Sequence, residues 1–189
     1  MKKAVLFVLC AALLLTLSTC GNRRERTREK AIAFAEDNLD LLRSYAQEWQ
    51  TAAESQLSER PDSLCYMVKR QSDGSLCLYD RWTQTETEYH SEMCQQLLKK
   101  RLIKGIDLYY YNGAWSVKFF CGGAGIGSNT EYWEIECIST DEPADLCFYD
   151  DTMTWTERDN GFFGRQENGD NTFYYYRIAE GVFYTEASF

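Results

Sequence analysis

The amino-acid sequence predicts an α+β domain in which an N-terminal amphipathic helix and a second, short helix pack on a twisted antiparallel β-sheet. Apolar residues recur at helical spacing early in the chain, whereas most of the remainder alternates between apolar and polar residues. Turn-forming residues separate the alternating segments. Because helical and strand patterns are grouped rather than regularly interleaved, the α+β class is favoured. We expect a single domain over residues 31–189.

The first predicted helix has one apolar and one polar face. Its apolar side chains follow one another at intervals of three or four residues: Ile32, Ala35, Leu39, Leu42, Ala46, Trp49 and Ala53. This helix must end before Pro61, because proline disfavours helical geometry in the residue before it. A second helix is predicted over residues 88–103, where three cations at 99–101 suit a helix C-terminus and Gly105 suits the cap.

The clearest strand pair is the hairpin around Asn112–Gly113, the preferred residue pair of a type I′ turn. This turn places Asp107 opposite Lys118 and assigns alternate residues to one core face: Ile106, Leu108, Tyr110, Trp115, Val117 and Phe119. The stretch EYWEIEC also alternates, so Trp133, Ile135 and Cys137 are expected to point inward. Glu134 and Glu136 are expected to point outward. Further strands are predicted over residues 64–69, 75–82, 146–155, 172–178 and 182–188.

The N-terminus has the layout of a secretory signal peptide over residues 1–19. Lys2 and Lys3 precede an apolar run over residues 4–17, which is too short to span a bilayer. The sequence LSTC, ending at Cys20, resembles a bacterial lipobox, although Thr19 stands where Gly, Ala or Ser is usual. The resemblance implies that Cys20 is lipidated and fastens the chain to the outer side of the cell membrane. Plain secretion, with cleavage near the same point, is the alternative.

Charge restricts the partners. Residues 20–30 form a short basic segment, which we interpret as a tether beside the anionic membrane surface, with a solvated tail or a first helical turn as the alternative. The whole chain carries a formal net charge of −9. Nucleic acid is therefore excluded as an expected partner, because phosphate binding needs a basic face. The predicted partners are the membrane, through the lipid on Cys20, and a protein, peptide or glycan ligand.

The stretch CGGAGIGSNT, residues 121–130, places four glycines between two aromatic segments. A phosphate-binding loop needs such glycines between a strand and a helix N-terminus, whereas here they join two predicted strands. We therefore predict a wide, flexible bend. Connections of this kind commonly carry binding residues, so we predict a ligand-contact loop with these members: Gly122, Gly123, Gly125, Gly127 and Ser128.

Residues 115–145 resemble, loosely, the C-terminal part of uncharacterised lipoproteins of Gram-positive bacteria. A strand, a Gly/Ser-rich loop, an aromatic strand and an acidic turn with proline recur there, matching VKFF, CGGAGIGSNT, EYWEIE and STDEP in this chain. The resemblance implies the same fold class and location. It implies no activity.

Cysteine spacing predicts one disulfide. Six of the eight cysteines follow Cys20, an even number in an oxidising environment. If residues 139–145 form a symmetric turn, Cys137 and Cys147 lie opposite each other at a separation that suits a disulfide. Free cysteines used as small core residues are the alternative. We expect no metal site, because C-x-x-C is absent and His90 is the only histidine, and we expect no cofactor.

Two functional hypotheses follow. The favoured one is a non-catalytic binding or interaction module that contacts its ligand through the glycine-rich loop and an aromatic surface containing Tyr109 and Tyr111. The alternative is an extracytoplasmic hydrolase that uses His90 or paired carboxylates such as Glu134 with Glu136.

Overall fold

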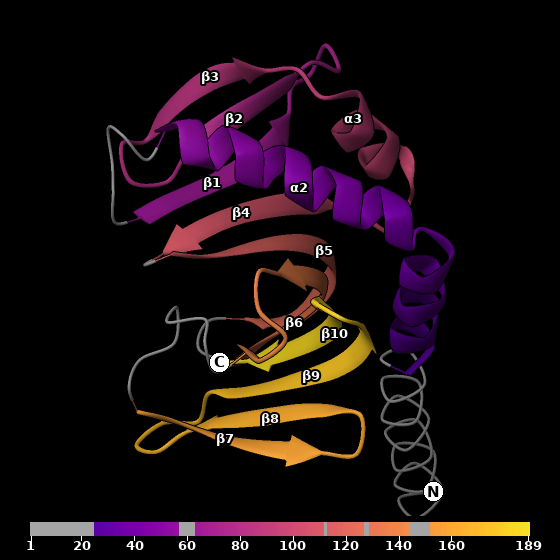
Figure 1. Cartoon of the computed structure of the whole chain (residues 1–189), viewed down its shortest axis with the longest axis vertical. Helices are drawn as coiled ribbons and strands as arrows, with labels where there is room; N and C mark the ends of the chain where they lie inside the picture. The colour runs from indigo at the N-terminus through magenta and orange to yellow at the C-terminus, as the bar shows by residue number, and fades with distance from the viewer. Residues whose placement is uncertain (1–24, 57–62, 112, 127–128, 144–151) are drawn as a thin grey trace, which may run out of the picture.

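The computed structural model describes residues 25–56, 63–111, 113–126, 129–143 and 152–189. Within these residues the chain forms one antiparallel sheet of ten strands in the order β3-β2-β1-β4-β5-β6-β10-β9-β8-β7 (Figure 1). The strand bounds are β1 Ser63–Arg70, β2 Leu76–Asp80, β3 Thr85–Tyr89, β4 Gly105–Tyr111, β5 Ala114–Ile126, β6 Asn129–Ile138, β7 Met153–Arg158, β8 Gly161–Gln166, β9 Thr172–Ala179 and β10 Val182–Ser188.

Three helical segments lie on one side of this sheet. Residues 25–37 are helical, α2 spans Leu39–Gln56 and α3 spans Glu92–Lys99. The first two segments meet at an angle (Figure 1), where the Asn38 side-chain amide donates a 2.8 Å hydrogen bond to the carbonyl of Phe34. The predicted first helix is therefore present but bent, and it includes residues 25–30 of the segment interpreted as a tether. The second helix is shorter than predicted and begins at the N-cap Ser91, whose hydroxyl accepts from the backbone N–H of Cys94.

The main core lies between the helices and the middle of the sheet. Alternate residues of β4, β5 and β6 supply its sheet side, and Leu42, Tyr45 and Trp49 of α2 supply its helix side. Trp49 packs edge-on against Tyr66 of β1, with ring centroids 5.4 Å apart. Each strand therefore sends every second side chain toward the helices, as the pleat requires.

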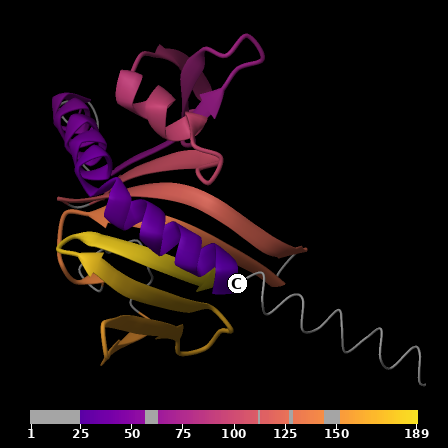
Figure 2. The ribbon, with the colours of Figure 1, turned by 90° about the vertical axis from the view of Figure 1, so that its right-hand side faces the viewer.

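A second core lies on the opposite face, where β7, β8, β9 and β10 curl. Its buried members are Ile138, Phe162, Phe173, Tyr175 and Phe183. Trp155 of the edge strand β7 stands edge-on to Tyr175 of β9 at a centroid distance of 5.7 Å. In Figure 2 the orange and yellow strands β7–β10 curl at the bottom of the sheet. We call the face without helices the open face.

The hairpin prediction is confirmed. Asp107 pairs with Lys118 and Tyr110 with Trp115. The predicted core-face residues of both strands lie in or against the main core. In β6, Trp133, Ile135 and Cys137 are buried on the helix side. The strands predicted at 64–69, 75–82, 172–178 and 182–188 are present as β1, β2, β9 and β10. The one predicted at 146–155 lies partly outside the described residues and overlaps β7.

The prediction of an α+β domain was wrong, because the structure is dominated by its sheet. Two strands carry no readable pattern. In β3, TETEY, four of the five residues are exposed, so no apolar alternation marks the strand, and its last two residues fall in the predicted second helix. In β8, GFFGRQ, the two glycines interrupt the alternation of apolar and polar residues that marks a strand. Half of the sheet also packs on itself through the second core rather than on a helix.

The hairpin register behind the expected Cys137–Cys147 disulfide was also wrong. β6 pairs with β5 on one side and β10 on the other, so Cys137 lies between Val117 and Val182. Its thiol is free and buried, as are the thiols of the other described cysteines. Cys147 lies outside the described residues, and the pairing itself stays a prediction.

Gly161 offers a test of the β8–β9 pairing. A Cβ atom there would lie 1.8 Å from the carbonyl oxygen of Tyr175. Gly161→Ala should therefore lower the free energy of unfolding by about 3 kcal/mol, as the two strands must separate. Gly105→Ala in β4 is the matched control and should cost less than about 1 kcal/mol, because its Cβ would have only Phe120 Cβ nearby, at 4.0 Å. Equal urea midpoints for the two variants would contradict this packing.

Candidate functional site

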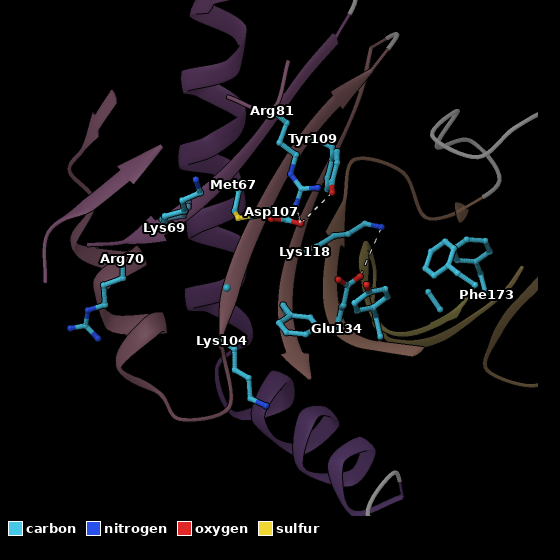
Figure 3. Close-up of a pocket in the computed structure, with 16 residues that line it drawn as sticks. Met67, Lys69, Arg70, Arg81, Lys104, Asp107, Tyr109, Lys118, Glu134 and Phe173 are labelled. Atoms are coloured by element: carbon cyan, nitrogen blue, oxygen red, sulfur yellow. Dashed lines mark hydrogen bonds and ion pairs between the residues drawn. The ribbon is translucent and has the colours of Figure 1, made fainter. Parts of the chain in front are cut away.

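The open face holds a cavity of about 790 Å³, lined by residues from β1, β4, β5, β6, β9 and β10 and from the turn after β2 (Figure 3). This volume lies in the range of small-molecule sites. The cavity lies on the face opposite the helices. The side chains on its floor occupy the alternate strand positions, which point away from the main core. Asp107 and Tyr109 of β4, for example, point away from Ile106 and Leu108.

One end of the polar floor is an ion pair. Arg81 and Asp107 are joined at 2.6 Å, and the Tyr109 hydroxyl donates to the same Asp107 oxygen at 3.3 Å (Figure 3). Burial, with the nearby Asp107 carboxylate, raises the pKa of Tyr109, so its hydroxyl stays protonated. Burial also raises the pKa of the neighbouring Cys65 thiol to about 11, so this thiol is not a nucleophile at neutral pH.

The other end of the floor is a lysine between two glutamates. The Lys118 ammonium lies 3.7 Å from Glu136 and 4.0 Å from Glu134. Glu136 is fully buried, and the Ser116 hydroxyl donates to one of its oxygens at 2.5 Å. Its second oxygen has no hydrogen-bond partner among the described residues. Burying a carboxylate in this way costs stability.

Glu134 differs from Glu136 in reaching the cavity. Its side chain is 15% exposed and lines the floor beside Lys118. Burial raises the pKa of Glu134 from 4.5 to about 7, and the Lys118 ammonium only partly offsets this. Glu134 therefore changes its charge near neutral pH, inside the cavity.

An aromatic wall bounds the cavity. The rings of Phe120, Tyr132, Phe189 and Phe173 follow one another with centroid distances of 6.0, 5.8 and 5.5 Å, each contact edge-to-face. We call this row the aromatic ladder. Tyr132 and Phe189, its central members, are 37% and 41% exposed. Large apolar surface of this kind, gathered in a cavity, is typical of a binding site.

Charged residues of both signs border the cavity. The cations are Lys69, Arg70, Arg81, Lys104 and Lys118, and the acidic side chains are those of Asp107 and Glu134. Lys69 is held by Glu86 of β3 at 2.9 Å. Lys104 and Arg70 are exposed and form no ion pair with another described residue. They lie two residues from Val68 and Ile106, which face the helices, so the pleat directs both side chains to the helix side of the sheet.

The predicted contact residues fall partly on this site. Tyr109 lines the cavity, whereas Tyr111, two residues further along β4, does not. The glycine-rich segment was predicted as a loop, but Gly122, Gly123 and Gly125 lie in β5 and pair with Trp133, Tyr132 and Thr130. Gly127 and Ser128 lie outside the described residues.

Gly123 nevertheless supports the cavity. A Cβ at Gly123 would lie 2.7 Å from the Glu131 carbonyl oxygen and 3.2 Å from the Tyr132 ring, so a side chain there would displace the ladder. Gly122 faces the main core instead, because a Cβ there would lie 3.2 Å from the Trp133 ring. The sequence thus indicated the right place, but the glycines give room to neighbouring side chains instead of contacting a ligand themselves.

The histidine of the hydrolase hypothesis lies elsewhere. The His90 side chain is 80% exposed and has Glu88 at 3.2 Å, outside the cavity. Within the described residues, no three His, Cys, Asp or Glu side chains cluster as metal ligands. Over the same ranges, no helix is both long enough and apolar enough to cross a bilayer.

Sequence reasoning missed most of the site. Arg81, Lys104, Phe120, Tyr132, Phe173 and Phe189 were not singled out, because they come from six separate segments that only the strand order brings together. The one available signal was alternation in β5 and β6, which placed Lys118 and Glu134 on the face away from the core. Comparisons with known proteins find no match to this chain among family models, curated proteins or solved structures.

Glu134 predicts a pH dependence of stability. Below pH 4.5 its carboxyl is neutral in the folded and unfolded chains. Between pH 4.5 and 7 the unfolded chain ionises first, so wild-type stability falls as pH rises, and the penalty is complete above pH 7. Glu134→Gln should therefore gain stability relative to wild type across this window, on the order of 3 kcal/mol.

Urea denaturation at several pH values measures this difference. Glu157→Gln, on the exposed edge strand β7, is the control for removing a carboxylate. Parallel stability profiles for wild type and Glu134→Gln would show that Glu134 ionises at its usual pH in the folded chain.

Proposed function

We propose that this chain is an extracytoplasmic, lipid-anchored binding module whose ligand site is the cavity on the open face. The leader, with Cys20 at its end, and the resemblance of residues 115–145 to Gram-positive lipoproteins support the location. The lipid on Cys20 holds the module at the membrane, and the cavity takes the ligand. The ligand classes expected from the sequence were a protein, a peptide or a glycan.

One observation carries the proposal: a cavity of about 790 Å³ in which exposed aromatic rings lie beside a charged floor. A solvated sheet face without a ligand does not require exposed Tyr132 and Phe189 beside partly buried charges. Concave sites that combine apolar walls with a few convergent polar groups are the usual form of ligand pockets.

Binding is favoured over catalysis because the polar floor is already paired. Asp107 is held by Arg81 and Tyr109, and Lys118 lies between Glu134 and Glu136. Paired charges of this kind can orient a ligand through their electrostatic field. They do not place a nucleophile beside a general base, which covalent catalysis needs.

One observation favours the hydrolase alternative. Glu134, with its pKa near 7, has the property expected of a general acid at neutral pH. A glycoside hydrolase needs a second carboxylate that reaches the substrate. Glu136 is fully buried, and the Asp107 carboxylate, which lines the cavity, is held by Arg81 and Tyr109. If the chain hydrolyses a glycan, Glu134→Gln must abolish turnover while ligand binding persists, and retained turnover would remove Glu134 from this role.

Cys20→Ala tests the anchor. The variant should leave the membrane fraction and lose incorporation of an alkyne-labelled fatty acid, because the thiol that receives the lipid is gone. Cys65→Ala, which removes a buried thiol of the domain, is the control and should stay in the membrane fraction. Unchanged fractionation of Cys20→Ala would contradict lipid anchoring.

A fragment screen followed by nuclear magnetic resonance tests the site. Anionic, neutral and cationic fragments are titrated into the isotope-labelled full chain, and the shifted amide signals are assigned. We expect the largest shifts in β4, β5, β6 and β10 around the cavity. Ala187→Trp, which fills the cavity from β10, should abolish these shifts. Shifts confined to other surfaces, or unchanged in Ala187→Trp, would contradict the proposed site.

A further inference from the structure

We propose that the cavity on the open face binds a small organic cation, with its ammonium group at Glu134 and its apolar body along the aromatic ladder. This inference rests on the proposed binding function and names the chemical class of the ligand. A protonated amine with an alkyl or aromatic body has both of the parts that the cavity can recognise.

Glu134 stands beside the first two rings of the ladder. Phe120 is its direct partner across the β5–β6 pair, and Tyr132 lies two positions earlier on the same strand, hence on the same face. The two ring centroids are 6.0 Å apart, and all three side chains line the cavity. A cation that reaches this carboxylate is therefore placed against aromatic rings, whose faces attract positive charge.

The charge around Glu134 is short of one cation. Lys118 and Arg81 are the positive groups that act most strongly on Glu134, and Glu136 and Asp107 are the negative ones. With Glu134 ionised, this floor therefore holds three carboxylates against two cations. A ligand can supply the positive charge that the floor lacks.

Lys118 is shared between two carboxylates. Its ammonium lies 3.7 Å from the fully buried Glu136 and 4.0 Å from Glu134 (Figure 3), which is beyond hydrogen-bond distance. Within the described part of the chain, the Glu134 carboxylate accepts no hydrogen bond, and one Glu136 oxygen also has no partner. The ammonium group of a ligand can donate to Glu134 from the cavity, and such charge-assisted hydrogen bonds are among the strong ones.

The apolar body of the ligand is matched by the rest of the ladder. Two of the four exposed large hydrophobic residues in the described ranges, Tyr132 and Phe189, are its central rings. A ligand that covers them removes apolar surface from water, which is the main source of affinity for such a wall. The ladder runs from Phe120, opposite Glu134, to Phe173, so the sites for the ammonium group and for the body are continuous.

An anion, a glycan or a peptide strand fits this surface less well. The open-face cations Lys69, Arg81 and Lys118 each have a carboxylate partner, so an anion would meet the excess negative charge of the floor. A neutral glycan would leave that charge uncompensated. Strands β1, β4, β5, β6 and β10 are each paired on both sides, so they offer no open edge to strand addition.

Isothermal titration calorimetry with phenylbutylamine, which is protonated at neutral pH, tests the inference. The protein is the full chain carrying Cys20→Ala, which prevents lipidation. Phenylbutanol is the neutral control with the same body, phenylbutyrate reverses the charge, and methylamine is the head-only control. The amine should bind about 10-fold more tightly than the alcohol and about 100-fold more tightly than methylamine. Phenylbutyrate should bind more weakly than the alcohol.

Matched variants separate the two parts of the site. Glu134→Gln should make the amine and the alcohol bind equally, because the amide keeps the shape of the side chain and removes its charge. Glu157→Gln, the same change on the edge strand outside the cavity, should keep the preference for the amine. Tyr132→Ser should weaken both ligands about 10-fold. Tyr111→Ser, at an equally exposed tyrosine outside the cavity, should leave both unchanged.

Proton release gives a second readout of the same contact. Burial raises the pKa of Glu134 to about 7, and a cation beside it favours the ionised form. With a preference of about 10-fold for that form, amine binding should release about half a proton per ligand at pH 6.5 and almost none at pH 8.5. Calorimetry in two buffers of different ionisation enthalpy measures this release, which Glu134→Gln should abolish.

The outcomes distinguish this inference from the proposed function. Equal affinity for the amine and the alcohol, tighter binding of phenylbutyrate, or a preference for the amine that survives in Glu134→Gln overturns the organic cation and leaves a binding cavity. Fragment shifts around the cavity without any amine binding have the same meaning. If neither the amine nor any fragment reaches the open face, both proposals fall.

Discussion

The pleat of β5 and β6 is the constraint on which the rest of the structure depends. Side chains alternate strictly between the two faces of a strand, so burying Ile135 and Cys137 beneath the helices forces Glu134 and Glu136 onto the opposite face. Helices cover only one side of the sheet, and Glu136 is buried by its sheet neighbours, Lys118 and Phe183. The carboxylate is tolerated there because Lys118 and Ser116 reach it. The polar floor thus follows from the core packing on the other side.

The second core gives this floor its walls. Phe173 and Phe183 are buried against Phe162 and Tyr175. Trp155 of the edge strand β7 packs on Tyr175 and covers this cluster. A twisted sheet that packs on itself at one end becomes concave on that side. The aromatic ladder lies where the curled end meets the flatter β1–β4–β5 part, and it continues from the second core through Phe173. Curvature and cavity therefore have the same cause.

Local patterns predicted what local physics determines. Asn112–Gly113 set the β4–β5 register correctly, and alternation placed Glu134 and Glu136 on the right face. The pairing of β6 with β10 joins residues 45 to 57 positions apart, and no local pattern encodes it, so the hairpin expected to pair Cys137 with Cys147 was wrong. The edge strand β3 was not predicted because an exposed, charged edge strand is polar on both faces, a feature that protects it from aggregation. The aromatic ladder was not predicted because its rings come from strands that only long-range pairing brings together.

The stability that the polar floor costs the fold supports a binding role. A buried carboxylate oxygen without a hydrogen-bond partner, and a second carboxyl whose pKa is raised to about 7, both lower stability. Apolar residues at Lys118 and Glu136 would satisfy the sheet at less cost. Local violations of this kind are expected where a protein binds or reacts. Here Glu134 lies beside the exposed rings of the aromatic ladder, so a destabilising group and groups suited to a ligand share one cavity.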